Sequence, residues 1–272
     1  MANIYNTYLH KVISPFKLRH LKLYKVIKRN KKHYLHTYFE GENVDKIPFS
    51  STGTCRAGGF YFTDYLNVPL YINYGELIAD VTLSDDAKVY VEKDKFKADK
   101  IIISNIRSLD KFFSDFNYPK LHAVKLNGKI LKYFKKQTED ICLEAVRQDG
   151  FALKYVKNQT EEICLEAVKQ NSYTIPFVKK QTEKICLEAV KQAQHILKYV
   201  EKPNKEICLE AVREDGYNLR HVENQTEEIC IEAVKQNGYV LKFVKNQTPK
   251  IYLEAVKQNP VAERHIRIVI DF

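Results

Sequence analysis

Apolar and polar residues recur with one spacing of 22 positions through the second half of the chain. Six related copies of the segment Q-T-E-E-I-C-L-E-A-V-K-Q follow one another without insertion, and a fainter copy precedes them at Leu121. Within one copy, Ile163 and Ala167 stand four residues apart, as do Cys164 and Val168, so each pair shares a face of a helix. The pattern therefore predicts a short amphipathic helix in every copy.

Residues on both sides of each predicted helix supply its start and its end. Thr or Asn stands at the N-cap position, and acids such as Glu161 follow in the first turn, where they oppose the positive end of the helix dipole. A break such as Asp149-Gly150 comes next, and its glycine permits a left-handed C-cap. Because an apolar pair such as Leu153 and Val156 recurs after each break, a second short helix is expected there.

One pair of such helices is too small to bury its own apolar face, whereas stacked copies can bury it as a continuous core. About seven copies, from near Asp115 to the C-terminus, predict an α-solenoid, which we assign to residues 108–272. A unit of 22 residues is shorter than the tetratricopeptide, ankyrin and HEAT repeats, so none of those names describes it.

Five of the six cysteines occupy one position of the repeat. The chain has no C-x-x-C, which argues against a metal site, and equivalent Cα atoms in stacked units should be about 8–10 Å apart, too far for a disulfide. We therefore expect these cysteines to be small buried residues with free thiols. Because free thiols persist in reducing surroundings, they also indicate a reducing compartment. The five are Cys142, Cys164, Cys186, Cys208 and Cys230.

An acidic residue and, three positions later, a basic one also recur in the repeat. Stacking would align them as parallel stripes of opposite charge, which could form a banded binding surface or simply a solubilising face. The candidate binding residues are Glu144, Arg147, Glu166, Lys169, Glu188, Lys191, Glu210, Arg213, Glu232 and Lys235.

Residues 34–107 differ in composition from the repeats. They have glycines at 53, 58 and 59 and β-branched or aromatic runs at 60–63, 77–82, 88–92 and 100–104. Such runs predict strands. We therefore expect an α+β protein, in which a small strand-rich N-terminal domain over 34–107 precedes the α-solenoid.

Positive charge concentrates at the N-terminus. The chain carries a net charge of +10, and the first 39 residues hold nine basic side chains and no acid. Residues 1–33 are either a basic arm attracted to phosphate, on nucleic acid or an anionic membrane, or a helix that starts at Pro15 and packs Leu18 and Val26 on the next domain. No stretch of eighteen apolar residues predicts a transmembrane helix. The arm's candidate residues are Lys17, Arg19, Lys22, Lys25, Lys28, Arg29, Lys31 and Lys32.

Two segments resemble known families. The stretch ENVDKIPFSSTGTCRAGGFYFTDYLNVPLYINYGELIADVTL, followed by KFKADKIIIS, resembles the N-terminal domain of uncharacterised mimivirus-family proteins, in many of which ankyrin repeats follow. The 22-residue unit resembles a repeat family of unknown function from giant DNA viruses of amoebae and amoeba-associated bacteria. The resemblance implies a viral protein made in a host cell, and it brings no established activity or catalytic residue.

A weaker resemblance concerns the strand that contains G-F-Y-F-T, which is loosely similar to ADP-ribosyltransferase cores. In that family a His and a Tyr hold the nicotinamide dinucleotide, and an acid often completes the site. The matching residues are His36 and Tyr61, with Glu76 and Glu92 as guesses for the acid. The alternative for Tyr61 is an aromatic packed in a sheet.

These patterns favour a non-enzymatic scaffold that binds host or viral proteins through its helical repeats, without cofactor or metal. The alternatives are an ADP-ribosyltransferase-like enzyme in the N-terminal domain, and nucleic-acid or anionic-surface binding through the basic arm. We expect the protein in the host cytoplasm, with the virion as the alternative location.

Overall fold

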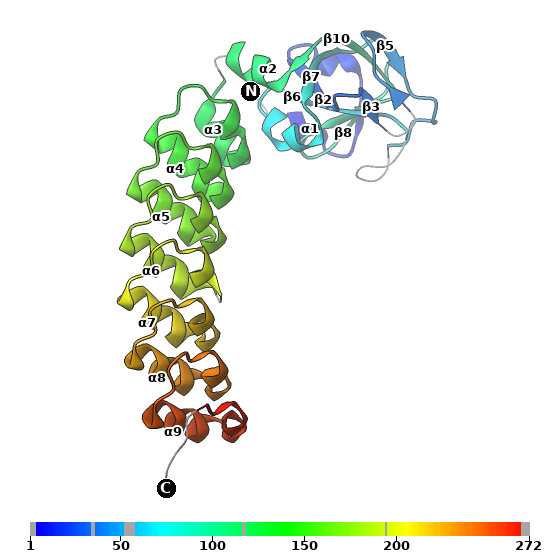
Figure 1. The fold of residues 1–272 in the computed structure, drawn as a ribbon. Coiled ribbons are helices and arrows are strands. Elements are labelled where there is room, and N and C mark those ends of the chain that lie inside the picture. Colours follow the sequence, from blue (N-terminus) through cyan, green and yellow to red (C-terminus); the bar gives the residue numbers. More distant parts are fainter. Residues whose placement is uncertain (1–3, 34–35, 52–57, 116–117, 194, 268–272) are drawn as a thin grey trace. The chain divides into compact units, whose positions relative to one another are not determined.

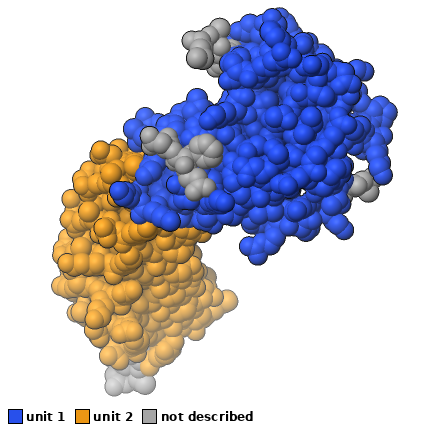
Figure 2. Space-filling view, turned by 90° about the horizontal axis from the view of Figure 1, so that it is seen from above, with its two compact units in different colours: residues 1–136 blue, residues 137–272 orange. Residues whose placement is uncertain are grey.

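The computed structural model describes residues 4–33, 36–51, 58–115, 118–193 and 195–267. The chain divides into two compact units, residues 1–136 and 137–272 (Figures 1 and 2). A strand-rich first unit and helical repeats in the second confirm the predicted α+β class.

The first unit is built on an eight-stranded sheet in the order β1-β8-β9-β6-β2-β7-β10-β5, in which neighbouring strands pair antiparallel. β3 and β4 pair antiparallel in a separate two-stranded sheet. Strands were found at all four runs where the sequence predicted them. The bounds are β1 Val12–Ile13, β2 Leu23–Ile27, β3 Lys32–His33, β4 His36–Thr37, β5 Gly41–Val44, β6 Phe60–Asp64, β7 Leu77–Thr82, β8 Val89–Val91, β9 Phe96–Ala98 and β10 Lys100–Ser108.

Short helices complete this unit. Phe112 of α2 packs edge-on against Tyr24 of β2, with 5.0 Å between the ring centroids, and Asn127 donates from Nδ2 to the carbonyl of Pro69 at 3.1 Å. The first copy of the repeat, α3 with its 3₁₀ segment, therefore packs within the first unit. The bounds are α1 Ile4–Tyr8, η1 Pro15–Leu18, η2 Val68–Tyr74, α2 Leu109–Asp115, α3 Lys120–Leu126 and η3 Gly128–Tyr133.

The helix considered for the basic arm is not present, and this part of the sequence analysis was wrong. Pro15 begins a single 3₁₀ turn that ends at Leu18, and residues 23–27 form β2 in the interior of the sheet, between β6 and β7. Leu23, Val26 and Ile27 fit both patterns, because a short apolar run of this kind does not distinguish a helix from a buried strand.

The second unit consists of six helix pairs, each an α-helix followed by a 3₁₀ segment (Figure 1). With α3 and η3, the described residues contain seven pairs, as predicted. The bounds are α4 Glu139–Gln148, η4 Gly150–Tyr155, α5 Glu161–Gln170, η5 Ser172–Phe177, α6 Glu183–Gln192, η6 Ile196–Tyr199, α7 Lys205–Glu214, η7 Gly216–His221, α8 Glu227–Gln236, η8 Gly238–Phe243, α9 Pro249–Gln258 and η9 Pro260–His265.

The break inside each pair has a different cause from the one the sequence suggested. Asp149 is extended at φ −151°, and its side chain accepts from the amide of Phe151, so it caps the 3₁₀ segment that follows. Gly150 does not have a positive φ. A Cβ on Gly150 would lie 2.7 Å from the carbonyl oxygen of Ala167 in the next repeat. Close packing against the next repeat, and not a left-handed C-cap, therefore explains the glycine at position 150.

The core of the second unit runs through all its α-helices. Ile163, Ala167 and Val168 and their equivalents in α6, α7 and α8 are nearly inaccessible to solvent. The five repeat cysteines are free and buried, as predicted, whereas Cys55 lies outside the described residues. Burial raises the pKa of Cys186 and of Cys230 to about 11, so these thiols stay protonated at neutral pH.

Candidate functional site

Two features of the described residues could serve a function: the surface of the helical repeats and a cavity in the first unit. On the repeats, some polar side chains hold neighbouring copies together, whereas others face solvent.

A glutamine in the loop before α4, α5, α6, α8 and α9 links successive copies. Gln159 donates from Nε2 to the carbonyls of Leu153 (3.3 Å) and Phe177 (2.9 Å), and its Oε1 accepts from the amide of Lys179 at 2.9 Å. The same Oε1 lies 3.6 Å from Sγ of Cys164. Gln137, Gln181, Gln225 and Gln247 take the equivalent place. Sequence reasoning missed this role, although the Q of every N-Q-T was a regular signal.

The charged ladders also link copies. Arg147 donates from Nε to Oε2 of Glu166 in the next copy at 2.9 Å, and Arg213 does the same to Glu232 at 3.3 Å. Lys191 lies 3.7 Å from Glu210. The hydrogen bond from Arg147 lowers the pKa of the Glu166 carboxyl below its ordinary value.

The remaining members of the ladders lie on the same helices. Lys169 and Lys235 approach the glutamates three residues before them, at 3.5 and 3.4 Å, and Glu188 accepts from Gln192. Glu144 is half-buried on α4. The predicted stripes therefore exist, but much of their charge is paired within the repeats.

The 3₁₀ segments carry a different surface, rich in aromatic rings. Tyr173, Phe177 and Tyr199 are 49%, 38% and 37% exposed. Rings of successive copies meet edge to face, as in Phe151–Phe177 and Tyr173–Tyr199, with centroids 6.0 and 6.4 Å apart. We call the following set the aromatic–cationic edge: Phe151, Lys154, Tyr155, Tyr173, Phe177, Lys198, Tyr199, Tyr217, Lys242 and Phe243.

Cations lie over several of these rings. Lys154 Nζ is 4.7 Å from the centroid of Tyr155, and Lys198 Nζ is at the same distance from Tyr199. The six α-helices from α4 to α9 carry fifteen acidic and nine basic residues, whereas the segments from 149 to 267 between and after them carry five acidic and eleven basic residues. The 3₁₀ side of the repeats is therefore both more aromatic and more basic than the α-helical side.

The basic residues predicted at the N-terminus do not share one helical face. Lys17 lies in η1, Lys25 in β2 and Lys32 in β3. Arg19 pairs with Asp85 at 2.7 Å. Lys22, Lys28, Arg29 and Lys31 are exposed, whereas Lys25 is only 7% exposed. Deletion of residues 1–33 would also remove β2, so the phosphate-binding hypothesis has to be tested by substituting exposed lysines.

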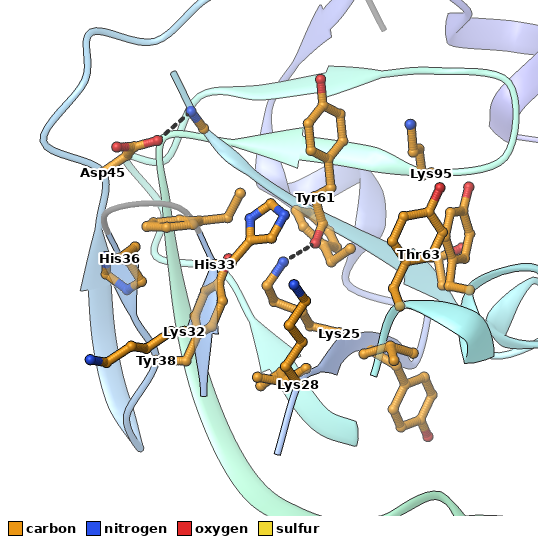
Figure 3. Close-up of a pocket in the computed structure, with 18 of the residues that line it drawn as sticks. Lys25, Lys28, Lys32, His33, His36, Tyr38, Asp45, Tyr61, Thr63 and Lys95 are labelled. Carbon is orange, nitrogen blue, oxygen red and sulfur yellow. Dashed lines mark hydrogen bonds between the residues drawn. The ribbon is translucent and has the colours of Figure 1, made fainter. Parts of the chain in front are cut away.

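A cavity of about 600 Å³ lies in the first unit, beside β2 and β6 (Figure 3). Aromatic residues outnumber aliphatic ones in its lining, namely Tyr24, Tyr38, Phe60, Tyr61, Phe62, Tyr71 and Tyr74. Its charged lining consists of five lysines and one carboxylate, Asp45. Both oxygens of Asp45 accept from backbone amides, from Ile47 at 3.0 Å and from Gly59 at 2.7 Å.

Lys25 reaches the cavity from β2. Its Nζ donates to the carbonyl of Tyr61 at 2.6 Å and lies 4.7 Å from the ring centroid of Tyr38 (Figure 3). Burial lowers the pKa of Lys25 from 10.5 to about 7, because the ammonium form loses its hydration. Burial and the charges of Lys25 and Lys28 also lower the pKa of His33, in that order of importance.

His36 and Tyr61 line this same cavity, but their side chains point in different directions (Figure 3). Nε2 of His36 lies 3.0 Å from Oδ1 of Asn43, and its ring packs against Tyr38 and Phe60. Neither guessed acid lines the cavity: Glu76 accepts from the amide of Arg29, and Glu92 pairs with Lys95 at 3.4 Å. The ADP-ribosyltransferase alternative stays a prediction that these contacts do not strengthen.

The described residues contain no group of three or more His, Cys, Asp or Glu side chains placed to hold a metal ion. Within the same part of the chain, every helix is too short or too polar to cross a bilayer.

Comparisons with known proteins agree with the resemblance seen in the sequence. The model of a domain of unknown function (DUF4116) matches residues 121–160 and 204–248. "Putative ankyrin repeat protein R229" of Acanthamoeba polyphaga mimivirus is 34% identical over 104 residues, 35% of this chain and 34% of the relative. "Putative ankyrin repeat protein L100" of the same virus is 33% identical over 113 residues, 38% of this chain and 18% of the relative.

A further mimivirus relative, "Putative ankyrin repeat protein R896", is 27% identical over 95 residues. The predicted similarity to mimivirus proteins and to a repeat family of unknown function is confirmed. The matches span about a third or less of the length of these curated relatives. No solved structure matches the chain significantly.

Proposed function

We propose that this chain is an interaction protein whose helical repeats bind a protein of the host or the virus through the aromatic–cationic edge. The observation that supports the proposal most directly is the exposure of Tyr173, Phe177 and Tyr199 on successive 3₁₀ segments. Exposed tyrosines of this kind are frequent energetic centres of protein interfaces, because they bury a large area and lose little conformational entropy.

The charge of this edge suggests the chemistry of the partner. The segments that form it carry an excess of basic residues, and lysines lie over its rings. An acidic surface on the partner would be complementary to it. The Glu and Lys ladders are weaker candidates, because Arg147, Arg213 and Lys191 already pair with glutamates of the next copy.

The names of the relatives support the same role. They are named as ankyrin repeat proteins, and stacked repeats in general present long surfaces to partners. Whether the partner belongs to the host or to the virus is the part of the proposal that an experiment must decide.

The test uses the full chain as bait in a lysate of infected amoebae, with quantitative mass spectrometry. A variant with Tyr173→Ser and Tyr199→Ser removes two exposed rings, and a matched control with Lys169→Ser and Lys235→Ser alters the charged ladder. A protein enriched by the wild type and by the control, but lost with the aromatic variant, is expected. Equal enrichment by all three chains, with circular dichroism unchanged, would contradict the aromatic–cationic edge as the contact.

A further inference from the structure

Three lysines are buried around Tyr61 in the first unit. Lys25 donates to the backbone carbonyl of Tyr61, while Nζ of Lys95 and of Lys97 lie 4.5 and 5.3 Å from its ring centroid. Lys97 is fully buried and also donates to the carbonyl of Ser50 at 2.9 Å. Buried cations are unfavourable unless opposite charge compensates them.

For Lys25, the described residues supply no such opposite charge. Glu92 is the one buried carboxylate among the described residues of this unit, and it pairs with Lys95. Asp45 lines the cavity, but its oxygens accept from two backbone amides. Across the described chain, no carboxylate lies within ion-pair distance of Lys25.

The cavity beside Lys25 offers room and a surface for a ligand that carries the missing charge. Its volume of about 600 Å³ lies within the range of small-molecule sites. Aromatic residues outnumber aliphatic ones in its lining, and Tyr74, which is 61% exposed, stands at its rim. Lys28, Lys32 and Lys46 add positive charge around it.

We propose that this cavity binds a small organic anion with an aromatic body, whose phosphate or carboxylate pairs with the Lys25 ammonium. The rings would pack against the aromatic body of the ligand, and the surrounding lysines would attract its charge. Burial lowers the pKa of Lys25 to about 7, and an anion beside it would raise that pKa and favour the ammonium form. The site is separate from the repeat surface, so its test is independent of the proposed protein interaction.

Isothermal titration calorimetry with 1-naphthyl phosphate tests this site in the full chain. The Lys25→Met variant keeps the length of the side chain and removes its charge, and Lys17→Met removes an exposed lysine outside the cavity. We expect Lys25→Met to weaken binding about tenfold or more, as the loss of a charge-assisted hydrogen bond would, and Lys17→Met to leave it within about twofold. Tyr74→Ala, at the exposed rim, should weaken binding by about threefold without disturbing the fold.

Two further probes distinguish the source of the binding energy. Uncharged 1-naphthol should bind at least about tenfold more weakly than the phosphate, and dodecanoate, an anion with an alkyl body, should also bind more weakly. The proposal is overturned if 1-naphthyl phosphate shows no binding at about 1 mM, if Lys25→Met binds it as the wild type does, or if dodecanoate is preferred.

Discussion

Lys25 lies in an interior strand of the sheet, where most lysines would be excluded. Burial lowers its pKa to about 7, whereas in the unfolded chain it titrates near 10.5. Below pH 7 both states are protonated, and the folded state bears the full cost of a buried charge. Between about pH 7 and 10.5 the unfolded state holds a proton that the folded state has released, so the free energy of unfolding rises with pH across this window.

Substitution of Lys25 by Met should therefore stabilise the first unit, and more so at low pH. A shift of this size corresponds to a few kcal/mol, and loss of the hydrogen bond to Tyr61 subtracts about 1 kcal/mol. We expect a gain of about 2–4 kcal/mol at pH 6 that shrinks steadily by pH 9. Urea denaturation at both values measures it, with Lys17→Met as the control. A gain independent of pH would contradict the assigned burial of the charge.

Gly150 shows a second constraint at the scale of one residue. Its missing side chain allows the carbonyl of Ala167 in the next copy to approach, and the Gly150 amide donates to Oε1 of Gln170 at 2.7 Å. Gly150→Ala should cost about 1–3 kcal/mol, because backbone must move to admit the methyl group. Ser172 occupies the equivalent position one repeat later and already has a Cβ.

Ser172→Ala is therefore the matched control, and it should change the free energy of unfolding by less than about 1 kcal/mol. Thermal unfolding followed by circular dichroism compares the two variants. If Gly150→Ala unfolds at the temperature of the wild type, close packing does not explain the glycine at this position.

At the scale of the element, the glutamine links connect the backbone of one repeat to that of the next. Each glutamine side chain forms hydrogen bonds with backbone carbonyl and amide groups of two successive copies. In the fourth copy of the motif, Pro203 replaces the glutamine, and proline has no side-chain amide that could form the link. The backbone of His221 and Glu223, which corresponds to that of Phe177 and Lys179, lacks this link.

The two positions make a paired prediction. Gln159→Leu should lower the free energy of unfolding by about 2–4 kcal/mol, because it leaves several backbone groups without their partner. Pro203→Gln should raise it by about 1 kcal/mol or more by restoring the link. Urea denaturation of the full chain measures both changes. Stabilisation by Gln159→Leu, or no effect of either variant, would show that the links contribute nothing.

The elements also show which patterns the sequence reveals. The period of 22 predicted the helix pairs and the buried cysteines, because a residue that recurs every 22 positions has the same surroundings in every stacked copy. It did not predict that the second helix is 3₁₀. Strand β2 was mistaken for a helix, because its partners β6 and β7 lie far along the chain.

At the scale of the whole molecule, the first compact unit extends to residue 136. The hydroxyl of Tyr118 contacts the carbonyls of Tyr65 and Leu66, the latter at 3.0 Å, and Phe112 packs on Tyr24. These contacts favour a boundary after residue 136, whereas the sequence alone placed it at 107, where the strands end. The cavity could not be predicted either, because its lining comes from segments between residues 24 and 95.

Two fragments test this boundary. Residues 1–136 should unfold cooperatively, whereas residues 1–107 should be less stable by several kcal/mol, because they lose the buried rings of Phe112, Phe113 and Tyr118. Differential scanning calorimetry of both fragments measures the difference. Equal melting temperatures would favour the shorter domain.

The most direct test of the proposed protein interaction is photo-crosslinking from the repeat surface in infected cells. The photoreactive residue p-benzoylphenylalanine is placed at Tyr199, on the aromatic–cationic edge, and in a separate chain at Glu162, which is exposed on α5. If the aromatic–cationic edge binds a protein, a crosslinked protein is expected from position 199 and none from position 162. A crosslink from position 162 alone, or from neither position, would contradict the claim that this edge binds a protein partner.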